Sequence, residues 1–289
     1  MKKLRDVSSV SSIVSNIAGR PVKIALIVLS LASVLFPIYW LVTSSLKMSQ
    51  EYIAYPPVLV PTKVVTDSYL EVFTRDKLGT TFMTSLVVAM ATTVISVLFG
   101  SMAAYTLSRG RISAKARAGF GLWFLIQKMY PAIATAIPIY LVMRALRLMD
   151  TQAALIIINT SFNLPLVIWL MMGFFEQLPH ALEESAMLDG CSYFKRFFLI
   201  ILPLTKPGLI AAGILTYVAT WNEFLFAVIL SIKNTRTLPV VIAGFITDRG
   251  LAWGPMAAAA VIMLIPVVLL AWVVQRDFVQ GLAMGAVKG

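Results

Sequence analysis

The chain has 289 residues, of which 59% are hydrophobic and only 13% are charged, with a formal net charge of +11. A soluble domain carries roughly 25% charged residues, so a water-facing surface could not be solvated by so few charges. The composition therefore excludes a water-soluble protein and indicates one that resides in a membrane.

Six apolar segments follow one another along the chain, and each has about the ~20 residues that a helix needs to cross a bilayer. Four lie in stretches that contain no charged residue or histidine, and the other two are each broken by one charge, Lys128 and Glu223. The expected spans are 24–45, 82–107, 119–143, 152–175, 208–230 and 255–275. The predicted fold class is all-α, a polytopic membrane protein with six transmembrane helices, because the strands of a membrane barrel would alternate apolar and polar residues.

Lysine and arginine favour the cytoplasmic side of a membrane protein and so predict its orientation. Fourteen fall in the tail 1–23, the loop 108–117, the loop 176–207 and the tail 276–289, against nine on the opposite side. We expect a multi-pass membrane protein with both termini in the cytoplasm. The positive charge then reflects topology and not nucleic-acid binding, which would need a soluble basic face.

Outside the spans, the sequence predicts two features of local structure. In the external loop 46–81, apolar residues at helical spacing predict a short helix around Asp67–Thr74. The glycines of 277–289 disfavour a firm helix in the C-terminal tail.

The central spans contain residues that interrupt a helix or are costly in lipid. Prolines and asparagines in 119–143 and 152–175 permit kinks beside a wet cavity, although ordinary helix packing also uses them. A charge in the bilayer costs ~2.5–3.5 kcal/mol, so Lys128 and Glu223 need an explanation. They could face a translocation cavity, pair with each other, or, for Glu223, reach water near the outer surface. The candidate pathway residues are Lys128, Asn159, Asn163, Tyr217, Trp221, Asn222 and Glu223.

The loop 176–207 is longer than a helical hairpin requires. Pro179 suits the start of a helix that continues to Leu188, Gly190 can end it in a left-handed conformation, and Ser192 can cap a second helix. Small residues at Ala181 and Ser185 would let another protein approach closely, while Glu183 and Glu184 stay available for charged partners. A helix resting on lipid headgroups fits the periodicity equally well. The acidic residues favour the first alternative.

The segment Glu184–Gly190 followed nine residues later by Ile200–Pro203 resembles the EAA loop of ABC importer permeases. That pattern reads E-A-A, three residues, G, nine residues, I-x-L-P, and the one departure is Ser185 for the middle alanine. The resemblance implies that the loop couples the chain to an ATPase. The implied coupling residues are Glu183, Glu184, Ser185, Ala186, Leu188, Asp189, Gly190, Ile200, Leu202 and Pro203.

Further motifs are similar to the carbohydrate-uptake branch, in particular to the second permease of maltose-type importers. They are Trp221–Phe224, Thr237–Pro239, Gln275–Gly281 and Gly285–Gly289. The resemblance implies a type I importer permease fold, a heterodimer with a second permease, two copies of a cytoplasmic ABC ATPase and an extracytoplasmic solute-binding protein. It implies transport of a sugar or polyol across the bacterial cytoplasmic (inner) membrane.

The chain itself is not expected to be an enzyme. It contains no G-x-x-x-x-G-K-[ST] phosphate loop, so ATP and magnesium are expected on the partner ATPase and no cofactor on this chain. One cysteine and one histidine offer no metal site. Two alternatives stay open: an ABC permease for a non-sugar solute, and an ion-coupled secondary carrier that uses Lys128 and Glu223 as its coupled pair.

Overall fold

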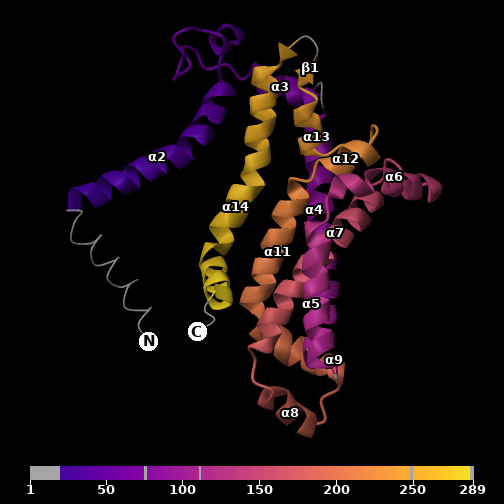
Figure 1. The fold of residues 1–289 in the computed structure, drawn as a ribbon. Coiled ribbons are helices and arrows are strands. Elements are labelled where there is room, and N and C mark those ends of the chain that lie inside the picture. Colours follow the sequence, from indigo (N-terminus) through magenta and orange to yellow (C-terminus); the bar gives the residue numbers. More distant parts are fainter. Residues whose placement is uncertain (1–19, 75–76, 111, 248–249, 287–289) are drawn as a thin grey trace. The chain divides into compact units, whose positions relative to one another are not determined.

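The computed structural model describes residues 20–74, 77–110, 112–247 and 250–286, most of them in helices (Figure 1). The chain divides into two compact units. One contains residues 1–71 and 252–261, and the other contains residues 72–251 and 262–289. The long helix α14 (Trp253–Ala286) contributes residues to both.

The first unit contains the helix α2 (Arg20–Ser44), the short helix η1 (Ser49–Tyr52) and most of α3 (Asp67–Thr74). Residues 22–39 of α2 are all exposed, as expected of a helix made for lipid surroundings, and Thr43 and Ser44 at its end are buried. The segment after α2 is folded around Glu51, whose carboxylate accepts hydrogen bonds from the Met48 N–H at 3.0 Å and from the N–H and hydroxyl of Thr62 at 2.9 and 2.6 Å. The short helix expected at Asp67–Thr74 is confirmed as α3.

The second unit holds the remaining elements. In chain order these are α4 (Leu78–Arg109), α5 (Ala114–Met129), η2 (Ala132–Thr135), α6 (Ala136–Ala145), α7 (Gln152–Glu176), α8 (Ala181–Leu188), α9 (Tyr193–Arg196), the π-helix η3 (Phe197–Ile201), α10 (Leu202–Leu204), α11 (Lys206–Trp221), α12 (Leu225–Leu230) and α13 (Leu238–Ala243). The strands β1 (Ile246–Thr247) and β2 (Gly250–Leu251) then pair antiparallel, with Ile246 opposite Leu251.

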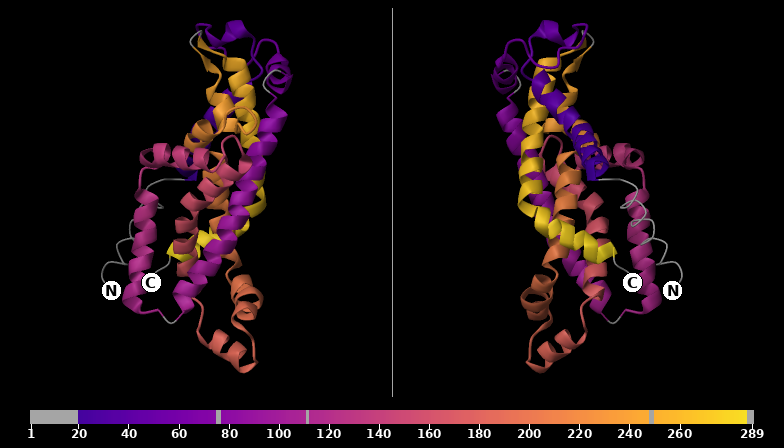
Figure 2. Two further views of the ribbon diagram at one scale, coloured as in Figure 1. Left: turned by 90° about the vertical axis from the view of Figure 1, so that its right-hand side faces the viewer. Right: turned by 90° about the vertical axis from the view of Figure 1, so that its left-hand side faces the viewer.

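The core of this unit forms where α4, α7 and α11 lie side by side (Figures 1 and 2). Two glycines allow the closest approaches. A Cβ added to Gly100 of α4 would lie 2.6 Å from Val167 Cγ1 of α7, and one added to Gly208 of α11 would lie 2.5 Å from the ring of Phe174. Small residues at helix contacts are how helices pack in lipid, where apolar burial gives little driving force.

The described residues contain four single helices that are long and apolar enough to span a membrane, namely Val22–Ser44, Leu78–Arg109, Gln152–Glu176 and Trp253–Gln275. Two bent pairs bring the number to six if each counts as one span. These pairs are Ala114–Met129 with Ala132–Ala145, bent by 85°, and Tyr193–Leu204 with Lys206–Trp221, bent by 82°. Six spans were expected from the sequence, and the fold is all-α apart from the two short strands.

Three expected helix bounds differ from the structure. The span 119–143 is broken because Pro131 follows Tyr130, and a residue before proline is driven out of the helical conformation. The span 208–230 is broken after Trp221, and a separate helix starts at Leu225. The glycines after residue 276 do not end α14, which continues to Ala286.

The carboxylate of Asp150, in the turn before α7, holds the loop between α12 and α13. Asp150 accepts hydrogen bonds of 3.0–3.2 Å from the backbone N–H groups of Ile232, Lys233, Asn234 and Thr235. The side chains of Asn234 and Thr235 add bonds of 2.8 and 3.0 Å. Partial burial alone would raise the pKa of Asp150, but these donors outweigh it and hold that pKa below its ordinary range. Asp150 therefore acts as a clip that organises a loop more than eighty residues away in sequence.

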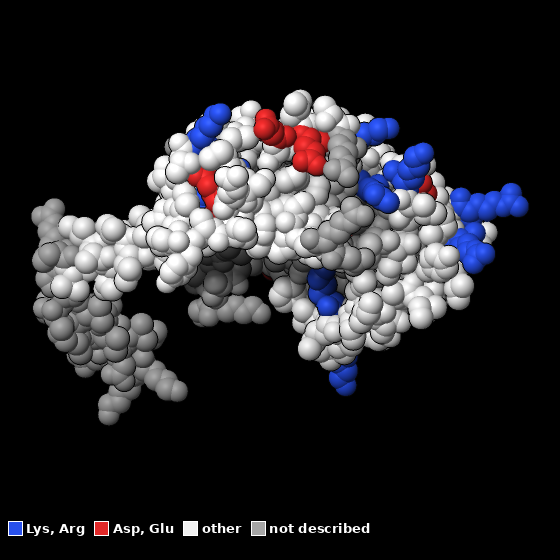
Figure 3. All heavy atoms as spheres, turned by 90° about the horizontal axis from the view of Figure 1, so that it is seen from above, with Lys and Arg blue, Asp and Glu red and all other residues white. Residues whose placement is uncertain are grey.

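The clip lies among exposed cations. Arg144, Arg147, Lys233 and Arg236 are all exposed. Lysine and arginine side chains are prominent on the face of the molecule that Figure 3 shows. These four belong to the side that the lysine and arginine distribution assigns to the exterior.

Candidate functional site

The loop after α7 forms the helix α8 (Ala181–Leu188), with His180 at its N-cap position (Figure 1). Gly190 follows with a φ of +74°, which confirms the expected left-handed residue at the end of this helix. The Ser192 hydroxyl then accepts a hydrogen bond from the Lys195 N–H at 3.4 Å, which confirms the expected cap of α9. The sequence therefore specifies the local fold of the loop closely.

Most of α8 is exposed, and its surface combines acidic, small and apolar side chains. Leu188 is 90% exposed and Met187 52%, although both are large apolar residues. Glu184, Ser185 and Asp189 are exposed beside them. Adjacent exposed apolar side chains with a polar rim form the kind of surface that protein contacts use, whereas one isolated leucine would need no explanation.

The carboxylate of Glu183 points away from this exposed surface, toward α4. Its Oε2 accepts a hydrogen bond from the Tyr105 hydroxyl at 2.9 Å, and its Oε1 lies 3.2 Å from Arg109 Nε. Arg109 Nη2 also donates to the carbonyls of Phe175 and, at 2.5 Å, of Leu178. The expectation that both Glu183 and Glu184 are free for an outside partner therefore differs from the structure, because Glu183 is already bound within the chain.

The ring of Tyr105 is packed between a transmembrane helix and the loop. Its centroid lies 5.8 Å from that of Phe175 on α7, 4.9 Å from that of Tyr193 and 5.1 Å from that of Phe197. These contacts join the loop to the apolar core. Ala186 is buried on α8, Ile200 and Leu202 pack against the core cluster, and Pro203 is exposed.

Most of the predicted pathway residues have separate hydrogen-bond partners in the structure. Asn159 and Asn163 are buried in α7, where their amides donate to the carbonyls of Leu155 and Asn159 at 2.9 and 2.8 Å. Asn163 also donates to the Thr220 hydroxyl at 3.3 Å and so links α7 to α11. Asn163 therefore makes a contact between helices, one of the two interpretations of its sequence, whereas the hydrogen bond of Asn159 stays within α7.

Tyr217, Trp221 and Asn222 lie near the end of α11. Tyr217 and Trp221 are buried with their rings stacked 5.7 Å apart, and Trp221 Nε1 donates to the Met263 carbonyl at 3.1 Å. Asn222 is exposed, and its amide donates to the Val218 carbonyl at 2.8 Å.

The two charges of the apolar spans have separate partners. Glu223 accepts hydrogen bonds from the N–H groups of Phe226 and Ala227 at 2.7 and 3.0 Å, so it caps the start of α12. Lys128 Nζ donates to the Phe162 carbonyl at 3.4 Å. Both side chains are described, and no ion pair joins them.

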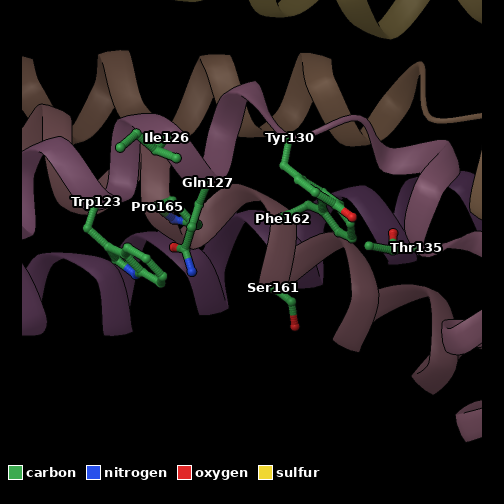
Figure 4. Close-up of a pocket in the computed structure, with 8 residues that line it drawn as sticks. All are labelled: Trp123, Ile126, Gln127, Tyr130, Thr135, Ser161, Phe162 and Pro165. Atoms are coloured by element: carbon green, nitrogen blue, oxygen red, sulfur yellow. The ribbon is translucent and has the colours of Figure 1, made fainter.

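An open pocket of about 440 Å³ instead lies between α5 and α7 (Figure 4). Trp123, Gln127 and Tyr130 line it from α5 and the residue that follows, at the i, i+4 and i+7 spacing of one helix face. Ser161, Phe162 and Pro165 line it from α7, and Ile126 and Thr135 complete it. Sequence reasoning missed this site, although the spacing of two aromatic residues around an amide was a signal that could have indicated it.

No cluster of three or more histidine, cysteine, aspartate or glutamate residues that could hold a metal occurs within the described ranges. The arrangement is that of an integral membrane protein in which an exposed helix, α8, is anchored to the packed spans. Residues 96–276 match the family described as binding-protein-dependent transport system inner membrane component, and the chain belongs to this family.

Relatives and solved structures agree with this family. The chain is 36% identical over 258 residues to the trehalose transport system permease protein SugB of Mycobacterium tuberculosis, covering 88% of this chain and 93% of that protein. It is 32% identical over 276 residues to the sulfoquinovosyl glycerol transport system permease protein SmoH of Agrobacterium fabrum, covering 95% and 96%. A chain of a bacterial ABC transporter that imports the acidic polysaccharide alginate has the same fold, with a TM-score of 0.74 at 24% identity over 90% of this chain and 99% of that one. This chain is accordingly a multi-pass inner membrane permease subunit of a binding-protein-dependent importer.

Proposed function

We propose that this chain is the permease subunit of an ATP-driven importer for a sugar or polyol, and that α8 and the residues around it receive the motion of a cytoplasmic ATPase. The observation that carries the proposal is the exposed surface of α8, with Leu188 at its end and the left-handed Gly190 directly after it. A groove on a soluble ATPase that accepts Leu188 and pairs with Glu184 would fit this surface. A rigid helix at that contact converts nucleotide state into a shift between inward- and outward-facing forms.

The remaining parts of the importer follow from the same proposal. A second permease completes the translocation pathway, two copies of the ATPase bind ATP and magnesium, and an external binding protein delivers the solute. Both termini and α8 then lie in the cytoplasm, as the lysine and arginine distribution predicts.

The sugar or polyol substrate is supported by the relatives, whose names include trehalose, diacetylchitobiose and sulfoquinovosyl glycerol transport. The pocket between α5 and α7 suits the same chemistry. Trp123 and Tyr130 offer flat apolar faces, and Gln127 between them offers an amide donor and acceptor. We assign this pocket to the solute pathway in place of the asparagines of α7, whose amides are bonded to carbonyls of α7 and, for Asn163, to Thr220. Uptake of a solute panel through the assembled importer separates sugars from amino acids and peptides.

Gly190 gives the sharpest test of coupling. A Cβ added there meets nothing within 4 Å, so a substitution acts through backbone conformation and not through a clash. Valine strongly disfavours a positive φ, whereas asparagine tolerates it. We expect Gly190→Val to abolish ATP-dependent uptake in proteoliposomes and Gly190→Asn to retain most of it, with both variants inserted equally. Uptake by Gly190→Val at the wild-type rate, with the ATPase bound, would contradict the coupling role.

An ion-coupled carrier is not favoured, because Lys128 and Glu223 do not form a pair and each has a local structural partner. Neutralising both residues separates the two functions, since an ABC permease would still transport and a carrier of that kind would not.

A further inference from the structure

The polar cluster beneath α8 connects three helices through three side chains. Tyr105 and Arg109 are one turn apart on α4, and both reach the carboxylate of Glu183 on α8. The guanidinium of Arg109 continues to the carbonyls of Phe175 and Leu178 at the end of α7. The carboxylate of Glu183 thereby ties α8 to α4, and the guanidinium of Arg109 ties the same end of α4 to α7.

The connection is buried, which makes it stiff. The Arg109 side chain is 2% exposed and that of Glu183 is 11% exposed. A charge in such surroundings cannot exchange its partner for water without a large cost, so the pair persists while the helices move. Of the eight residues of α8, only Glu183 and Ala186 are buried. Glu183 is therefore the buried polar side chain of α8, which it ties directly to α4 and, through Arg109, to the end of α7.

Arg109 also completes the end of a helix. The last carbonyl groups of an α-helix have no intrahelical donor. Phe175 lies in the last turn of α7 and Leu178 just beyond it, and both carbonyls receive the Arg109 guanidinium. A displacement of α8 that pulls Glu183 would thus act directly on the end of α7, and not only through the intervening loop.

We propose that Glu183, Arg109 and Tyr105 form a positioning cluster that transmits the movement of α8 to α4 and α7, which makes Glu183 an internal anchor and not a contact to the ATPase. The proposal rests on the proposed function, since it concerns how motion received by α8 reaches the spans. It assigns the two adjacent glutamates different tasks, with Glu184 outside and Glu183 inside.

Glu183→Gln tests the cluster, because glutamine keeps the size of the side chain and removes its charge. Glu176→Gln is the matched control, since Glu176 is an exposed glutamate at the end of α7 in the same segment. Each variant is assembled with its partner permease, ATPase and binding protein in proteoliposomes, and solute uptake and ATP hydrolysis are measured together. We expect Glu183→Gln to hydrolyse ATP with the solute transported per ATP reduced about fivefold or more, the lower end of coupling between sites. Glu176→Gln should match the wild type.

A second readout reports position without depending on activity. Cys191, the chain's one cysteine, lies just after α8 and donates its N–H to the Ala186 carbonyl at 2.9 Å. A nitroxide attached there, with cysteine-free partner subunits, should become more mobile in Glu183→Gln and unchanged in Glu176→Gln. Tyr105→Phe, which removes only the hydroxyl, should shift both readouts in the same direction by a smaller amount.

The outcomes separate the two proposals. Absence of ATP-dependent uptake by the wild-type assembly would overturn the proposed function itself. Wild-type transport together with unchanged uptake per ATP and unchanged nitroxide mobility in Glu183→Gln would overturn the positioning cluster alone. If Glu183→Gln fails to assemble, Tyr105→Phe decides, and wild-type uptake per ATP in that variant overturns the cluster.

Discussion

Replacing Asp150 with asparagine tests how firmly a single carboxylate holds the loop between α12 and α13. Asparagine keeps the shape of the side chain but loses the charge, and its NH₂ group replaces one of the two acceptor oxygens, so the donors that face this position lose their acceptor. A hydrogen bond to a charged group is worth ~1.5–3 kcal/mol. Asp150 is only partly buried, so solvent weakens its interactions. We therefore take about 2 kcal/mol as the total destabilisation of the loop in Asp150→Asn, a value near the lower end of the range for a single charged hydrogen bond.

The loop carries its own reporters, because Lys233 and Arg236 are exposed trypsin sites within it. Trypsin needs a locally opened chain, and when opening is fast its rate follows the open fraction. A change of about 2 kcal/mol raises that fraction by about 30-fold, and cleavage at these two sites should rise by the same factor. The products are separated by mass spectrometry over a time course in detergent.

The comparison has an internal and an external control. Cleavage at Lys63, an exposed lysine of the other unit, should not change, and Asp67→Asn, an exposed aspartate of that unit, should leave the 233 and 236 sites protected. Wild-type cleavage rates at Lys233 and Arg236 in Asp150→Asn would refute the clip.

Three further predictions concern pH, packing and the pocket. The pKa of Asp150 is depressed in the folded chain. The stability that its carboxylate contributes is therefore fully present above the unfolded pKa of about 3.9, and it is lost as the pH falls through the lower pKa of the folded chain. Hydrogen exchange of the amides 232–235, corrected for intrinsic rates, should therefore accelerate below about pH 4 in the wild type and show no such step in Asp150→Asn. Gly100→Ala should destabilise the protein by about 1–3 kcal/mol in thermal unfolding, because the added carbon meets α7, whereas Gly79→Ala on the same helix meets nothing within 4 Å and should be neutral or stabilising. Trp123→Ala should reduce solute uptake without changing ATPase binding, and equal uptake by variant and wild type would remove this residue from the pathway.

The sequence predicted most of what depends on short-range patterns. The runs without charged residues predicted the bounds of α2 and α7 to within a few residues. The capping residues and a left-handed glycine predicted α8 and α9. These succeed because hydrophobic length and local hydrogen bonding decide them. The bend after Met129 was only partly predictable, since a proline permits a kink but its angle depends on what the two halves pack against.

The inward turn of Glu183 could not be predicted in this way. Its partners, Tyr105 and Arg109, lie more than seventy residues earlier, and nothing in the local pattern distinguishes Glu183 from Glu184. The asparagines of α7 show the same limit, because a polar residue in a span reads equally well as a pathway or as a packing contact until its partner, here Thr220, is known.

The length of α4 has a consequence for the membrane around the protein. Its 32 residues make a helix about 48 Å long. Even at a tilt of about 40°, such a helix rises about 37 Å, more than the ~30 Å of hydrocarbon in a typical bilayer. One end must stand among the headgroups, and lipids with longer or shorter chains change how far it does so. A change in bilayer thickness therefore changes the depth at which Arg109 lies, so lipid composition can alter the surroundings of this residue.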